Sequence, residues 1–130
     1  MLRILKFAEK SSIVENFSVL DFRRGTEFYY VKMELLFKDG SHIYMREYLS
    51  PSERHYSFHW QLSEDKSLRW DNSPHYPSLE TYPNHLHVGE RTLVSHCSDP
   101  VKILSWIETL IKRQINLRPE NTINYLDELR

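Results

Sequence analysis

Residues 31–62 read VKMELLFKDGSHIYMREYLSPSERHYSFHWQL, and apolar side chains recur there at every second position. A period of two is typical of β-strands that bury one face. Asp39-Gly40 separates the first two apolar runs, and this dipeptide favours a tight hairpin turn. The stretch therefore predicts neighbouring antiparallel strands over residues 27–37, 42–49 and 55–62.

Strand-like runs continue on both sides of this stretch. Runs of β-branched, aromatic or alternating apolar residues predict further strands over 13–23, 67–71 and 85–93. Between the last two, residues 72–84 contain three prolines and predict a loop. A loop of this length in a small domain is usually functional or disordered, and its prolines and tyrosines favour a packed one.

The last third of the chain changes to a helical pattern. Asp99 is a good N-cap and Pro100 fits the first helical position, so we expect a helix over about 100–115. Pro119 starts a second short helix over about 119–129. The fold expected for residues 1–130 is a single α+β domain: an antiparallel sheet of about five or six strands, over about 13–93, with the C-terminal helix packed on one face.

Composition excludes several classes of protein. The 130 residues include only three glycines, in neither a G-x-x-x-x-G-K nor a G-x-G-x-x-G pattern, which excludes a P-loop and a dinucleotide-binding fold. The single cysteine, Cys97, excludes an internal disulfide, and the net charge of −1 is not that of a strongly basic nucleic-acid-binding protein. Without a long apolar run or a signal-peptide core, we expect no membrane contact and a cytoplasmic location.

The polar faces of two central strands form the first group of candidate residues. If the strands pair, these side chains lie about 5 Å apart across the sheet. Arginine binds phosphate, histidine transfers protons near neutral pH and tyrosine stacks on bases, so the face suits a phosphate or nucleic-acid ligand. An ordinary solvent-exposed sheet face has the same pattern. The residues are His42, Tyr44, Arg46 and Tyr48 on one strand, and His55, Ser57, His59 and Gln61 on the other.

Residues 69–87 hold the second group. His85 and His87 are two positions apart, so on a strand they share a face and can bind a divalent metal ion together with Asp71 or His75. A metal-free site is the alternative, with one histidine as general base, another as acid, and Arg69 neutralising a phosphate. In a third interpretation, His75 and His85 only anchor the proline-rich loop by hydrogen bonds.

Three motifs in these regions resemble the TumE family, small toxins of type II toxin–antitoxin pairs. They are Tyr56-Ser57-Phe58-His59-Trp60-Gln61, Arg69-Trp70-Asp71-Asn72-Ser73-Pro74-His75-Tyr76-Pro77 and Glu80-Thr81-Tyr82-Pro83-Asn84-His85-Leu86-His87-Val88. With Asp39-Gly40 upstream and the helix downstream, the resemblance covers about residues 26–110. Tyr76 and Asn84 depart from it, because the family pattern has histidine at both positions.

The resemblance implies a growth-inhibiting toxin that acts on RNA and is held inactive by an antitoxin protein. Together with the polar face it predicts an endoribonuclease in which His59 and His75 transfer protons, Arg69 and Arg46 stabilise charge, and Asp71 orients its neighbours. We expect RNA contacts from Arg46, Tyr48, His55 and Trp70. The enzyme needs either no cofactor or a divalent metal ion on His85 and His87. A non-catalytic module that binds a partner protein through the same His/Tyr-rich face is the competing interpretation.

Overall fold

The computed structural model describes residues 1–129, which form one antiparallel sheet and three helices. The expected α+β class is therefore confirmed. In chain order the elements are α1 (Leu2–Lys10), β1 (Val14–Arg24), β2 (Tyr29–Phe37), β3 (His42–Leu49), β4 (Arg54–Ser63), β5 (Lys66–Asp71), β6 (His85–Val88), β7 (Arg91–Val94), α2 (Pro100–Lys112) and α3 (Pro119–Leu126).

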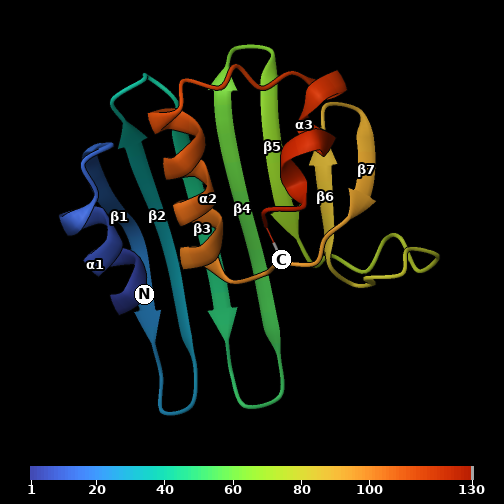
Figure 1. Ribbon diagram of the computed structural model, residues 1–130. Coiled ribbons are helices and arrows are strands. Elements are labelled where there is room, and N and C mark those ends of the chain that lie inside the picture. Colours follow the sequence, from blue (N-terminus) through green and yellow to red (C-terminus); the bar gives the residue numbers. More distant parts are fainter. Residues whose placement is uncertain (130) are drawn as a thin grey trace.

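The seven strands follow one another across the sheet in chain order, from β1 at one edge to β7 at the other (Figure 1). The expected hairpin between β2 and β3 turns at Gly40, whose φ of 89° lies in the left-handed region that favours glycine. The alternating pattern sets the register, because Met33 faces Met45 and Met45 faces Phe58 on the buried side.

The sheet has one more hairpin than the sequence pattern indicated. Residues 85–93, expected as a single strand, fold into β6 and β7, which pair antiparallel across a turn at Gly89. Gly89 has a φ of 59°, a conformation that an L-residue inside a strand rarely adopts. The expected single strand is therefore two strands of four residues each.

Helix α2 covers the middle of the sheet and builds the core. Its Ile103, Leu104 and Ile107 are fully buried, in the same cluster as the expected β2 residues Val31, Met33, Leu35 and Phe37. The ring of Trp106 lies edge-on to two sheet tryptophans, 6.3 Å from Trp60 and 5.9 Å from Trp70. Asp99 caps the helix by accepting hydrogen bonds from two backbone amides, as its position before Pro100 predicted. The helix ends near Gln114, whose φ of 55° is left-handed.

Helix α1 was not expected from the sequence. It buries Ile4 and Ala8 against the core and contacts both α2 and β1, and Ser11 just after it donates a hydrogen bond to Glu108 of α2. The four-residue spacing of Ile4 and Ala8 was the available signal, obscured by the charged residues between them.

The three helices lie on the same side of the sheet, which leaves the other face of the strands uncovered by any helix in residues 1–129 (Figure 1). None of the helices within this part of the chain is long and apolar enough to cross a membrane. Along the strands, polar side chains alternate with the apolar side chains of the core. The polar ones lie on the open face, and the candidate site lies there.

Candidate functional site

Strand register brings the polar residues of the open face into two adjacent rows. One row runs from Tyr44 on β3 through His59 and Arg69 to His87 on β6, each facing the next across neighbouring strands. The adjacent row runs through Arg46, Ser57, Asp71 and His85. Neighbouring strands are about 4.8 Å apart, so side chains within one row can contact each other directly.

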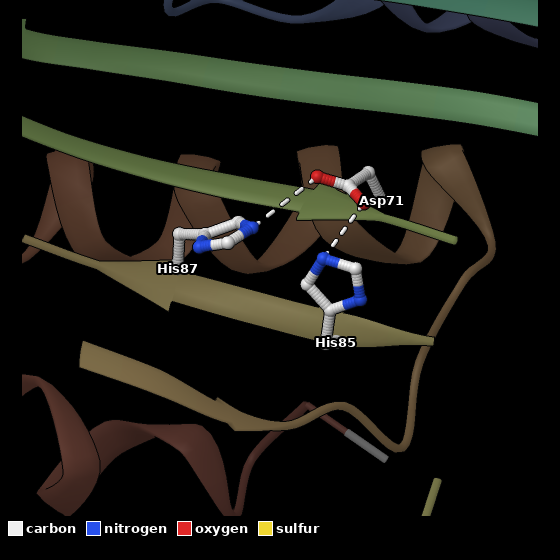
Figure 2. Close-up of side chains that lie close together, drawn as sticks. All are labelled: Asp71, His85 and His87. Carbon is white, nitrogen blue, oxygen red and sulfur yellow. Dashed lines mark ion pairs between the residues drawn. The ribbon is translucent and has the colours of Figure 1, made fainter. Parts of the chain in front are cut away.

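Asp71 is the centre of the cluster at the β5–β6 end of these rows. Its side chain is only 6% exposed, and the imidazoles of His85 and His87 both point toward its carboxylate (Figure 2). His85 Nε2 lies 2.7 Å from Oδ1, and His87 Nε2 lies 3.5 Å from Oδ2. Arg69 Nε donates to Oδ2 at 3.0 Å, and the backbone amide of Ser73 donates to Oδ1.

The outer ring nitrogens of the two histidines also have partners. His85 Nδ1 lies 3.0 Å from the carbonyl oxygen of Pro83, which can only accept, so Nδ1 carries a proton. His87 Nδ1 lies 3.4 Å from the hydroxyl oxygen of Thr92 on β7. These contacts fix both rings with Nε2 facing the carboxylate. The Nε2 atoms and the carboxylate lie within 4.8 Å of one another, close enough to hold a metal ion together.

His59 differs from these histidines because one of its ring nitrogens is unused. Its Nε2 is buried and has no hydrogen-bond partner in residues 1–129. Burial lowers the pKa of His59 below its usual 6.5, and the nearby charge of Arg69 lowers it further. His59 is therefore neutral at pH 7, and its unpartnered Nε2 is covered by neighbouring groups.

Arg69 lies between His59 and His87 in the row. Arg69 Nε donates a hydrogen bond to Asp71, and 44% of the Arg69 side chain is exposed. The outer guanidinium nitrogens are therefore accessible. Burial also lowers the pKa of His87, with the Arg69 charge as the second cause. The row thus places a cation with a fixed orientation between two imidazoles.

His75 lies beside the cluster, on the loop between β5 and β6. It is exposed, and its ring is 6.4 Å from that of Tyr76. Tyr76 in turn packs edge-on against His85 at 4.9 Å and His87 at 5.9 Å. Three of the four expected catalytic residues, His59, Arg69 and Asp71, are therefore linked through the strands, whereas His75 connects to them only through Tyr76.

The expected RNA contacts separate into two groups. Arg46, Tyr48 and His55 line one hollow of about 200 Å³ on the open face. Trp70, in contrast, is only 1% exposed and packs on the helix side against Trp106, so it cannot stack on a base. The prediction for Trp70 is wrong because Trp70 alternates with Arg69 and Asp71, and residues next to each other on a strand point to opposite faces.

Two partners in the cluster were not found from the sequence. Thr92 contacts His87 only because β7 folds back on β6, and the single strand expected there hid this contact. Tyr76 was noted only as a departure from the family pattern, yet its ring covers both cluster histidines. An aromatic residue in the proline-rich loop was the available signal.

The fold and the site define an α+β protein with a histidine–arginine–carboxylate cluster on an open sheet face. Comparison with known protein families matches residues 4–115 to the family described as Toxin TumE. The match spans most of the 130 residues, so the chain belongs to this family of toxins, and the resemblance seen in its three motifs is confirmed. No protein with a curated description and no solved structure matches the chain.

Proposed function

We propose that this toxin inhibits growth by cleaving RNA on the open face of its sheet, and that an antitoxin protein keeps it inactive. The observation that carries the proposal is the unpartnered Nε2 of His59, a neutral base next to Arg69 in the same row. A buried polar atom without a partner is rare, and beside the exposed Arg69 it indicates a group that gains its partner when substrate binds.

The proposed reaction is attack by the 2′-hydroxyl of a nucleotide on its own 3′-phosphate. His59 takes the hydroxyl proton on Nε2 after its ring turns to expose that atom, and the new bond to phosphorus gives a 2′,3′-cyclic phosphate. Arg69 stabilises the negative charge that develops on the phosphate oxygens, and Asp71 holds the guanidinium in position. The bond to the 5′-oxygen breaks, and that oxygen takes a proton from a water molecule on the exposed side of Arg69.

Trp70 is buried, but the other expected RNA contacts, Arg46, Tyr48 and His55, lie on the same face as His59. In the row next to His59, Arg46 faces Lys32 across β2 and β3, which gives the phosphate backbone two neighbouring cations. Tyr48 lies 6.0 Å from His55, ring to ring, and offers a surface on which a base can stack. A single-stranded RNA crossing the sheet would contact these residues and then reach His59.

The experiment that tests the proposal is incubation of purified protein with total RNA, with and without EDTA. We expect cleavage products that end in a 2′,3′-cyclic phosphate, and a rate about 10²–10⁴-fold lower for His59→Ala. His96→Ala is the matched control, because His96 is exposed and lies outside the cluster and the RNA-binding hollow. Its rate should equal that of the unmodified protein.

The competing interpretation gives the opposite result in the same experiment. A non-catalytic module that blocks a partner protein through its His/Tyr-rich face would slow growth without cleaving RNA. Growth inhibition that persists in His59→Ala, together with intact RNA in vitro, would therefore reject the nuclease and support the binding module.

A further inference from the structure

We propose that Asp71, His85 and His87 form a binding site for one divalent transition-metal ion of the zinc class. The proposal does not depend on RNA cleavage, because it concerns what the three side chains bind. Two imidazole nitrogens and one carboxylate are the donor set of many catalytic zinc sites, and such sites keep a fourth position free for water or substrate.

The donor atoms lie within 4.8 Å of one another, close enough for small side-chain rotations to bring them around such an ion. Bonds of 2.0–2.2 Å at tetrahedral angles place neighbouring ligand atoms about 3.4 Å apart. His87 Nε2 and the Asp71 carboxylate are already 3.5 Å apart. His85 Nε2 and Oδ1 are 2.7 Å apart and need to open by about 0.7 Å, which a small rotation of either side chain provides.

The groups behind the donors are a second, independent observation. Histidines that bind metals almost always donate their other ring N–H to a carbonyl or another polar group, which sets the ring orientation. His85 does this with the carbonyl oxygen of Pro83, and His87 has the Thr92 hydroxyl in the corresponding place. The contact of His85 also anchors the loop of residues 72–84, and it leaves Nε2 as the nitrogen that faces Asp71.

Burial of the three side chains also favours a defined site over a chance cluster. His85 and Asp71 are 2% and 6% exposed, whereas His87 is 20% exposed, so the site is closed on one side and accessible on the other. Tyr76 packs on both imidazoles and limits this access. An ion held here would lie next to Arg69, and the two cations together would attract a phosphate.

Two hydrogen bonds to the carboxylate work against the ion and limit the expected affinity, one from the Ser73 amide to Oδ1 and one from Arg69. Arg69 donates to Oδ2 of the same carboxylate and withdraws part of its charge. Imidazole donors favour Zn²⁺ and its neighbours over Mg²⁺, which prefers oxygen ligands. We therefore expect selective binding of Zn²⁺ and Co²⁺, and no competition from Mg²⁺ at equal concentration.

The test is a titration of the full chain, without a histidine tag and after removal of metal by a chelator. Calorimetry with Zn²⁺ should give one equivalent per chain, and Co²⁺ should give the visible absorption bands of a tetrahedral site. His87→Ala should lose the one-equivalent step and the bands. It is the preferred variant, because His87 is the most exposed of the three ligands and its loss disturbs the core least. Thr92→Val should weaken binding about 10–100-fold by removing the outer partner of His87.

Two controls keep the result specific. His55→Ala and His96→Ala remove exposed histidines outside the cluster and should keep the full equivalent and the Co²⁺ bands. The absence of a one-equivalent step in the unmodified protein, or an unchanged step in a folded His87→Ala variant, would overturn the proposal. Stoichiometric binding without RNA cleavage would support the metal site and reject the proposed nuclease, whereas cleavage by a protein that binds no metal would do the reverse.

Discussion

Two carboxylates are buried on opposite faces of this sheet, Glu47 on the helix side and Asp71 on the open side, and their surroundings differ. Glu47 accepts hydrogen bonds from the Tyr29 hydroxyl at 2.7 Å and from Arg54 Nε at 2.8 Å. Arg54 is held in turn by the hydroxyl and carbonyl oxygens of Ser98, just before α2. Burial and Glu47 raise the pKa of Tyr29 to about 12, so the phenol stays a donor.

Asp71 has partners of another kind. Within residues 1–129, three of its four contacts come from side chains that can exchange protons, bind a metal ion or hold a phosphate: His85, His87 and Arg69. The Glu47 network is complete within the protein, whereas the Asp71 cluster continues to the unused Nε2 of His59 and to solvent. Burial of a charge alone therefore does not indicate function; the chemistry and accessibility of its partners do.

The largest effect on stability should come from Glu47→Ala. Removing the carboxylate leaves Arg54, only 29% exposed, without its ion-pair partner, and we expect a loss of about 3 kcal/mol of unfolding free energy. Urea denaturation measures it. Glu53→Ala, which removes an exposed carboxylate that contacts His55, is the control and should change the unfolding free energy by less than about 0.5 kcal/mol. Equal effects for the two variants would contradict a structural role of Glu47.

Asp71→Asn should affect cleavage more than stability. The amide keeps the size of the side chain but removes the charged acceptor that orients Arg69, a contact of about 1.5–3 kcal/mol, so the cleavage rate should fall about 10–100-fold. Rates are compared with those of Glu47→Gln under conditions where both variants are folded by circular dichroism. An equal decrease in the cleavage rate for Glu47→Gln and Asp71→Asn would contradict the conclusion that the carboxylate on the open face, and not the one on the helix side, serves cleavage.

The pH dependence of cleavage should report His59. Because burial lowers its pKa below 6.5, the base form predominates at pH 7, and the rate should fall as the pH decreases below 6.5, by at most about tenfold per unit. Stability should change in the same direction. The unfolded chain binds more protons than the folded one just below pH 6.5, so the contribution of neutral His59 is lost as the pH falls. The unfolding free energy of His59→Gln should therefore decrease less on acidification than that of the unmodified protein. An equal decrease in both proteins would show that other groups cause it.

The smallest effect is expected for His75→Ala. His75 is exposed and touches the cluster only through Tyr76, so its removal should cost about one hydrogen bond to substrate, or roughly fivefold in rate. Melting temperature and cleavage rate are measured on the same variant. A loss near that of His59→Ala, with an unchanged melting temperature, would instead make His75 a catalytic acid, as the family motif suggested.

Local patterns were sufficient for much of the fold. The alternation in β2, β3 and β4 predicted their buried faces and the side of the sheet on which His59 lies, and Asp99-Pro100 predicted the start of α2. The same alternation, applied to β5, would have placed Trp70 in the core. The pattern did not predict α1, whose short apolar face is recognisable only beside α2. It also did not predict the turn at Gly89, where a single glycine separates β6 from β7.

The sequence by itself determined which side chains share a face of each strand and which family the chain resembles, because both depend on residues close together along the chain. Only the tertiary structure decided that Asp71 meets His85 and His87. The loop of residues 72–84 separates β5 from β6, and the register across that gap is set by Trp70 and Leu86, which face each other in the core. Burial of these apolar side chains against the α2 side of the sheet aligns the polar ones on the other face, and no local spacing contains that information.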